Sequence, residues 1–405
     1  MPNPITNFTD SFGVDLGNKL ITKEYLMSVY PQIANQLITP ELWGWGYNSD
    51  GQLGNNNITQ QNVPVTTFSG GANWKSIDAG RDFSVAIKTD GTLWTWGRND
   101  KGQMGVITGT LFVVSTPITV SSGSTNWKQI SCGQDHAAAI KTDGTLWTWG
   151  RNLSGELGNN TILTRSTPVT TFAGGNDWKQ VSCGTNCTAA IKTNGSLWNW
   201  GGGSNGKLGT NESVTRSTPV TTFAGGNNWK QVSSGFQHTA AIKNDGTLWL
   251  WGRNDSYGQL GINTSTNRST PVTTFAGGND WKQVATGSNH TVAIKTDGTL
   301  WTWGQNGYAQ LGNNNVTTSR SPITTFAGGT NWKSVESFGY FSVAIKTDGT
   351  LWTWGRNQFG GLGDNTTTNR STPVTTFAGG TNWKQVATGN NHTVAIKTSD
   401  DLQGI

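Results

Sequence analysis

Hydrophobic and polar residues follow one unit that recurs along the chain. Its clearest part is Leu-Trp-x-Trp-Gly, whose seven copies begin at Leu42, Leu93, Leu146, Leu197, Leu248, Leu300 and Leu351, in steps of 51, 53, 51, 51, 52 and 51 residues. In the second copy, strand alternation places Trp94 and Trp96 on one face and Leu93 on the other. A period this regular predicts a stacked or closed array of one supersecondary unit.

Each unit contains the signals of four short strands. In the second copy, residues 73–77, 83–88 and 92–96 alternate as strands, and residues 89–91 supply an Asp-Gly turn, which is typical of a β-hairpin. A fourth strand, such as residues 165–172, contains a proline, which is tolerated on an outer edge strand. Four strands per unit and seven units predict an all-β, seven-bladed β-propeller.

The two ends of the repeat predict how the ring closes. The chain enters the repeat at Leu42 with the third strand of a unit, and residues 394–397 are the second strand of one. We therefore expect the last blade to combine N-terminal and C-terminal strands, which removes an exposed sheet edge. The propeller domain is expected to span residues 42–405.

Residues 1–41 lack the repeat and contain the one clear helix signal. Thr22 is a candidate N-cap, the apolar positions include Tyr25, Leu26 and Tyr30, and Pro31 limits continuation of the helix. This leader is expected either to cap one edge of the domain or to anchor it to a larger assembly, with Tyr25, Leu26 and Tyr30 as the anchoring residues.

Composition and charge narrow the function classes. The chain has 55 Gly and 21 Trp but only 13% charged residues, which suits glycine-turned aromatic strands. The net charge of +5 comes from lysines spread one per repeat, such as Lys75 and Lys88, and not from a basic cluster, so nucleic-acid binding is not expected. No apolar run reaches the ~18 residues of a membrane span, and three cysteines make no disulfide framework.

The repeat resembles that of the regulator of chromosome condensation (RCC1) family. Residues 287–295 read Gly-x-x-His-Thr-x-Ala-Ile-Lys and are followed by Asp297-Gly298 and Trp303-Gly304-x-Asn306. The resemblance implies a seven-bladed propeller; the founding member is a chromatin-bound exchange factor for a small GTPase, and relatives serve as scaffolds and sensors. The near-identical repeats, Thr/Asn-rich connections and leader are similar to versions found in bacteria and tailed phages.

No motif indicates catalysis. His136, His238, His290 and His392 occupy a position that other repeats fill with Phe83 and Phe341, so they are expected to be packing residues and not metal ligands. Residues 201–207 imitate a phosphate-binding loop but lack its strand-to-helix context. We therefore expect no enzyme activity, no cofactor and no metal.

Positions at which the repeats differ are the best candidates for recognition. The residues after Trp-Gly are Tyr47, Arg98, Arg151, Gly202, Arg253, Gln305 and Arg356, and the same loops carry Tyr257, Tyr308 and Phe359. Arg and Tyr are common at binding hot spots. We expect this ring, without Gly202, to bind a protein or a surface glycan.

Two functions follow as hypotheses. The first is a non-enzymatic interaction or surface-binding scaffold, in a virion or at a cell surface. The alternative is a regulator of a small GTPase or of chromatin, as in the founding family.

Overall fold

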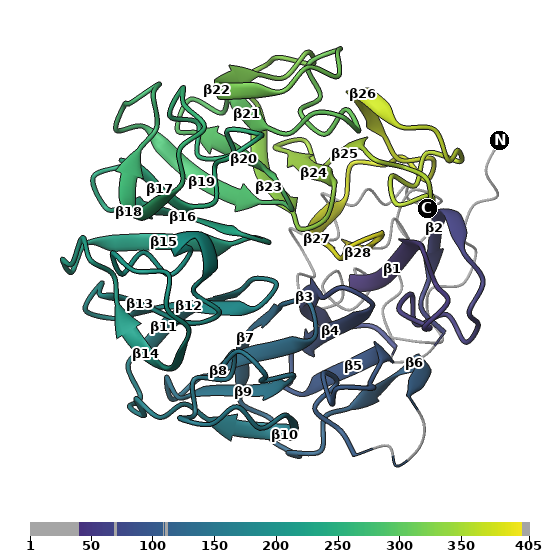
Figure 1. Ribbon diagram of the computed structural model, residues 1–405. Helices are drawn as coiled ribbons and strands as arrows, with labels where there is room; N and C mark the ends of the chain where they lie inside the picture. The colour runs from purple at the N-terminus through teal and green to yellow at the C-terminus, as the bar shows by residue number, and fades with distance from the viewer. Residues whose placement is uncertain (1–39, 69–70, 108, 110–111, 399–405) are drawn as a thin grey trace, which may run out of the picture.

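The computed structural model describes residues 40–68, 71–107, 109 and 112–398. They form seven four-stranded antiparallel sheets, arranged as blades around a central axis (Figure 1). The predicted seven-bladed propeller is confirmed. The predicted leader helix lies outside the described residues, and none of the helices within them is long and apolar enough to cross a membrane.

Every blade has the same strand order from the axis to the rim. The innermost strands are β3 (Trp74–Ala79), β7 (Trp127–Cys132), β11 (Trp178–Cys183), β15 (Trp229–Ser234), β19 (Trp281–Thr286), β23 (Trp332–Ser337) and β27 (Trp383–Thr388). The second strands are β4 (Phe83–Lys88), β8 (His136–Lys141), β12 (Cys187–Lys192), β16 (His238–Lys243), β20 (His290–Lys295), β24 (Phe341–Lys346) and β28 (His392–Thr398).

The two outer positions complete each sheet. The third strands, which carry the paired tryptophans, are β1 (Pro40–Gly46), β5 (Leu93–Arg98), β9 (Leu146–Gly150), β13 (Leu197–Gly201), β17 (Leu248–Gly252), β21 (Leu300–Gly304) and β25 (Leu351–Gly355). The outermost strands are β2 (Gln61–Thr66), β6 (Val113–Thr119), β10 (Arg165–Thr170), β14 (Arg216–Thr221), β18 (Arg268–Thr273), β22 (Ser319–Thr324) and β26 (Arg370–Thr375). As predicted, the proline-containing strand is the edge strand.

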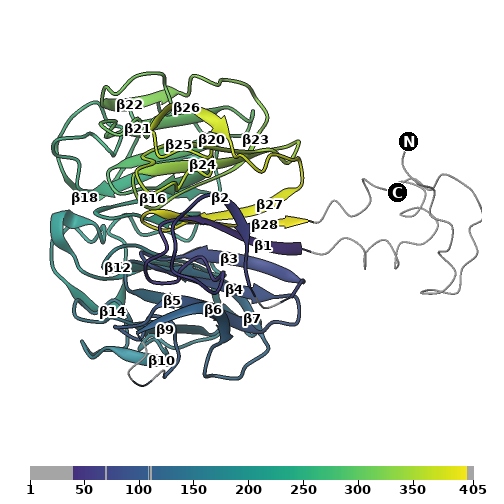
Figure 2. The same cartoon turned by 90° about the vertical axis from the view of Figure 1, so that its right-hand side faces the viewer.

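The ring closes through strands from both ends of the repeat. The sheet that we number blade 1 has the order β2-β1-β28-β27, and blades 2 to 7 follow as β3–β6 through β23–β26. Strands β1 and β28 pair in unbroken register from Pro40 opposite Thr398 to Gly46 opposite His392. Figure 2 shows the two strands side by side in the disc. The predicted closure is confirmed, and no described third strand is left as an open edge.

The tryptophans pack between neighbouring blades. Trp127 and Trp149 of blade 3, both at most 1% exposed, lie in one apolar cluster with Ile87 and Leu93 of blade 2. Trp149 also donates a 2.9 Å hydrogen bond from Nε1 to the Gln103 carbonyl oxygen of blade 2. Because a buried indole removes about 150–250 Å² from water, these residues supply much of the blade-to-blade stabilisation.

A lysine lies between two tryptophans in every blade. In blade 2 the Nζ atom of Lys88 is 4.9 Å from the ring centroid of Trp74 and 4.3 Å from that of Trp94. The equivalent lysines are Lys141, Lys192, Lys243, Lys295, Lys346 and Lys397. Through this cation–π packing, these seven lysines are part of the fold.

Candidate interaction face

The seven variable positions after Trp-Gly lie on one face of the disc, which we call the loop face. Each ends the third strand or begins its connection to the fourth, and lies beside the connection from the first to the second strand, as where Arg98 N–H donates to the Asp82 carbonyl oxygen at 2.9 Å. The preceding Gly97 has a φ of +106°, and a Cβ there would lie 2.6 Å from Asp82 O and Phe83 Cα. Only glycine fits this approach, which explains the constant Trp-Gly before a variable residue.

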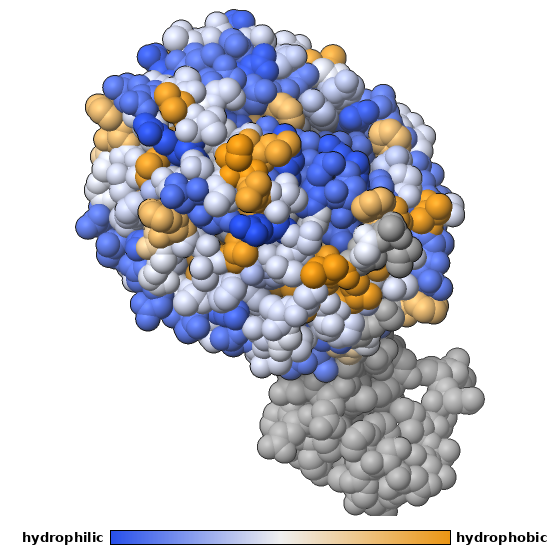
Figure 3. Space-filling model, turned by 60° about the horizontal axis from the view of Figure 1, so that its bottom comes forward, coloured by the Kyte–Doolittle hydropathy of each residue, from blue (hydrophilic) through white to orange (hydrophobic). Residues whose placement is uncertain are grey.

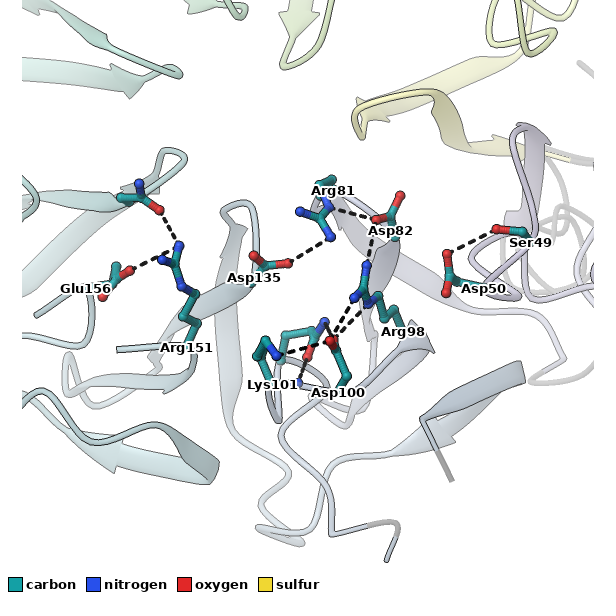
Figure 4. A network of polar contacts seen from close by, with 12 residues as sticks. Ser49, Asp50, Arg81, Asp82, Arg98, Asp100, Lys101, Asp135, Arg151 and Glu156 are labelled. Carbon is teal, nitrogen blue, oxygen red and sulfur yellow. Dashed lines mark hydrogen bonds and ion pairs between the residues drawn. The ribbon is translucent and has the colours of Figure 1, made fainter. Parts of the chain in front are cut away.

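Blades 2 and 3 place an ion-pair network on the loop face (Figure 4). Arg98 donates from Nε and Nη2 to the two carboxylate oxygens of Asp100, both at 2.8 Å. Arg81 pairs with Asp82 at 2.8 Å and reaches Asp135 of the next blade at 3.7 Å. Arg98 is therefore bound within the chain by carboxylates.

Arg151 is also occupied by its own surroundings. Its Nη1 donates to the Asn186 side-chain oxygen of blade 4 at 2.7 Å and lies 3.8 Å from the carboxylate of Glu156, which is fully buried. Burial raises the pKa of both Glu156 and Asp135. Burial also acts to raise the pKa of Asp100, but hydrogen bonds from Arg98 and Gln103 outweigh it and hold the pKa at about 2.

Blades 6, 7 and 1 bring other predicted residues into an aromatic cluster. Arg356 stacks against Tyr308 at 5.3 Å, Phe359 at 5.5 Å and Tyr340 at 5.8 Å, measured from Cζ to the ring centroids. Tyr47 meets Phe359 edge to face at 5.1 Å, and Tyr308 meets Tyr340 in the same way at 5.4 Å. We call Tyr47, Tyr308, Tyr340, Arg356 and Phe359 the aromatic–arginine cluster; all five are partly exposed.

The remaining predicted residues do not join this cluster. Arg253 pairs with Asp255 and donates to Gln237 at 3.1 Å, and Tyr257 has no ring contact within the described chain. Gln305 accepts a 3.0 Å hydrogen bond from Asn289. The proposed anchoring residues Tyr25, Leu26 and Tyr30 lie outside the described residues.

Sequence comparison of the repeats missed Tyr340. It belongs to the connection between the first and second strands of blade 7, whereas we compared the connections that follow Trp-Gly. Its copies in the other blades include Asp82, Asp135 and Gln237, so the same repeat comparison applied to this loop would have found the difference.

The histidines are packing residues, as predicted. All four are at most 1% exposed, and burial lowers the pKa of each to about 3. Each Nε2 bonds a hydroxyl of the next blade: His136 to Thr188, His238 to Thr291, His290 to Ser342 and His392 to Ser84, at 2.9 to 3.1 Å. Within the described ranges, no three His, Cys, Asp or Glu side chains are placed to hold a metal ion.

The innermost strands of two blades carry an acidic residue at a position that is Ser or Ala in the other blades. Asp78 and Glu336 stand where other blades have Ser131, Ser182, Ser233, Ala285 and Ala387. Asp78 accepts a 2.8 Å hydrogen bond from Cys132 N–H of the next blade. Desolvation raises the pKa of Asp78 to about 7 and, together with the charge of Asp78, raises that of Glu336 to about 8. In the sequence, these two acids could have been found because they differ from the residues at the same position of the other repeats.

Apolar side chains are also exposed around the disc. One phenylalanine per blade, except in blade 2, lies two residues after the outer strand and is 64–68% exposed: Phe68, Phe172, Phe223, Phe275, Phe326 and Phe377. Figure 3 shows that exposed apolar residues on one side of the disc are separate patches divided by polar surface. They therefore do not form one continuous apolar surface on that side.

The fold and repeat define a β-propeller of the RCC1 class, and comparison with known proteins agrees. The sequence profile of the RCC1-like domain matches residues 37–326, and that of the regulator of chromosome condensation (RCC1) repeat matches residues 348–396. The chain belongs to the RCC1-like domain family.

Individual relatives extend this picture. The chain is 32% identical to the ultraviolet-B receptor UVR8 of Arabidopsis thaliana over 335 residues, covering 80% of this chain and 75% of the relative. It is 27% identical over 375 residues to the human E3 ubiquitin-protein ligase HERC2, covering 90% of this chain but only 8% of that protein. The fold matches Prp20p of Saccharomyces cerevisiae, whose structure was described with its binding to Gsp1p and histones, with a TM-score of 0.79, 20% identity and coverage of 96% and 98%.

These relatives come from a plant, a mammal and a yeast. They support the RCC1-like family and give no support to the narrower bacterial or tailed-phage version, nor to a virion role.

Proposed function

We propose that this chain is a non-enzymatic protein-interaction module that binds its partner through the aromatic–arginine cluster on the loop face. The observation that carries the proposal is that the blades differ in the side chains that they place on the loop face. Although the seven blades are closely similar, blades 2, 3 and 5 present arginines paired to carboxylates, whereas blades 6, 7 and 1 present stacked rings around Arg356. Aromatic and arginine side chains are the residues that most often dominate binding energy.

The cluster is suited to a protein partner by its rigidity. Each ring is held by at least one edge-to-face or cation–π contact, so little side-chain freedom is lost on binding. Partly exposed rings offer apolar area, and Arg356 offers charge and hydrogen-bond donors. A surface glycan is the other ligand class that stacked rings can bind.

The test is affinity capture with the full chain as bait. The Tyr308→Ala/Arg356→Ala double variant should lower recovery of a bound protein by about 30-fold or more, as expected for hot-spot residues. The matched control is Arg253→Ala/Tyr257→Ala, which removes the same residue types from blade 5. Equal recovery by both variants and the wild type, or an equal loss by both variants, would contradict a site at the cluster.

The second candidate function is regulation of a small GTPase or of chromatin. It is favoured by the structural match to Prp20p, whose described partners are Gsp1p and histones. Nucleotide release from candidate GTPases, and DNA binding measured against salt concentration, test it directly. Absence of both accelerated release and salt-sensitive binding would eliminate this candidate.

A further inference from the structure

One loop position differs in blade 7 from all other blades. Six blades place a long, buried side chain there, at most 3% exposed: Gln52, Gln103, Glu156, Lys207, Gln259 and Gln310. Blade 7 has Gly361. The Gly361 carbonyl oxygen accepts from the Trp45 indole at 2.9 Å, as the Gln52 carbonyl oxygen accepts from Trp96 at 2.8 Å. The backbone is therefore equivalent, and only the side chain is missing.

The missing side chain has a defined hydrogen-bonding role elsewhere. In four blades its oxygen accepts from the backbone N–H two residues earlier, which belongs to Asp50, Lys101, Ser154 or Tyr308, at 2.7 to 3.0 Å. In blade 7 the corresponding N–H is that of Phe359. It has no acceptor among the residues that the structure describes.

A hollow occupies the place of the missing side chain. It is a shallow hollow that opens to solvent, with a cavity volume of about 10 Å³, and is lined by Phe341, Arg356, Gln358, Phe359, Gly361 and Asn391. A Cβ built on Gly361 would lie 3.3 Å from Asn391 O and 3.6 Å from Phe341 Cζ, and Gly361 does not have a positive φ. The φ of Gly361 therefore does not exclude a side chain, and the close approach to Asn391 O requires a shift of a few tenths of an ångström.

Arg356 at the rim of the hollow lacks the carboxylate that its counterparts have. Arg98, Arg151 and Arg253 each lie within 4 Å of an acidic side chain. The Arg356 guanidinium instead donates to the Gln358 side-chain oxygen, from Nη2 at 2.7 Å and from Nε at 3.1 Å. No described carboxylate forms an ion pair with it.

We propose that the hollow beside Gly361 binds an acidic side chain of a partner polypeptide. The carboxylate accepts from the free N–H of Phe359 and pairs with Arg356, while its aliphatic stem packs against Phe341 and Phe359. The partner thus restores the acceptor that Gln52, Gln103, Glu156 and Gln310 supply in their own blades. This inference rests on the proposed interaction role of the aromatic–arginine cluster and names the chemistry that the cluster recognises.

The test uses N-acetyl-glutamate amide, which carries a side-chain carboxylate and no terminal charges. Saturation-transfer NMR with the full chain should show saturable binding with a dissociation constant on the order of 1 mM, as expected for so small a ligand. Gly361→Gln, which installs the residue found in blades 1, 2, 5 and 6, should weaken binding at least tenfold without lowering Tm. Arg356→Gln should weaken it similarly, and the matched control Arg253→Gln should not.

Three results would overturn the proposal: no saturation at about ten times the expected dissociation constant, unchanged affinity in Gly361→Gln, or equal binding of N-acetyl-glutamine amide. The two proposals fail separately. Loss of partner capture in Tyr308→Ala/Arg356→Ala, combined with unaltered capture in Gly361→Gln, would leave the interaction role standing and remove only the acidic side chain.

Discussion

At the scale of the residue, burial between blades changes the pKa of a side chain and therefore the pH dependence of stability. The histidines illustrate this. His238 is fully buried with Nε2 2.9 Å from the Thr291 hydroxyl, and its folded pKa of about 3 is below the ordinary value of 6.5. The folded protein therefore keeps the ring neutral while the unfolded chain takes up a proton. The stability that results is present above pH 6.5 and is lost as pH falls toward 3.

We expect His238→Phe to make the protein less sensitive to acid. Phe fills the equivalent position as Phe83 and Phe341, so the ring should be accommodated. Between pH 6.5 and 4.5 the variant should retain about 2 kcal/mol of unfolding free energy that the wild type loses. The raised pKa values of Asp78 and Glu336 act in the opposite direction, but they are common to both proteins. Urea unfolding at several pH values measures the difference, and parallel pH curves would refute it.

At the scale of the element, a buried asparagine organises the connection between the third and fourth strands. In blade 6 the Asn306 side chain donates to Asn313 Oδ1, Asn315 O and Thr317 O at 2.9 to 3.1 Å. Its own Oδ1 accepts from Leu311 N–H at 2.9 Å. These bonds position the loop that places the residues after Trp-Gly on the loop face.

Replacing this asparagine tests that role. Asn306→Ala should cost about 3 kcal/mol, because it leaves several partly buried polar groups without partners. Val316→Thr in the same connection is the control, since Val316 is 62% exposed and should change stability by less than about 0.5 kcal/mol. Urea midpoints compare the two. Similar midpoints would show that the connection is held by other contacts.

At the scale of the whole molecule, ring closure depends on the seven-residue strand β1. It pairs with β28 on one side and β2 on the other, so it is a central strand of blade 1. Without β1, the edge of β28 would be open to another chain.

Two truncated chains distinguish the contribution of β1 to ring closure from the role of residues 1–39. A chain beginning at Pro40 should remain a closed monomeric disc with little change in Tm, and it should fail to join a larger assembly where the leader is the anchor. A chain beginning at Tyr47 lacks β1 and should unfold at least about 10 °C lower and associate through its open edge. Calorimetry and light scattering after size exclusion measure both. A monomeric, equally stable second truncation would refute closure by β1.

The amino-acid sequence by itself determined the number of blades, the four strands in each and the strand that closes the ring. These features depend on local signals repeated seven times: the Asp-Gly turn, the Trp-Gly step and strand alternation. The ring of variable residues after Trp-Gly could also be predicted from the sequence, because equivalent positions in a repeat lie on one face of the disc.

Only the tertiary structure decided which ring residues are available to a partner. Arg98 and Arg356 look equivalent in the repeat, yet Arg98 is held by Asp82 and Asp100 whereas Arg356 stacks on rings from two blades. Asp100 and Phe359 belong to the same loops as their arginines, but Asp82 and Tyr308 come from other loops, so those contacts depend on how the loops meet in space. The same holds for Gly361, whose missing side chain matters because Phe359 and Arg356 line the hollow beside it.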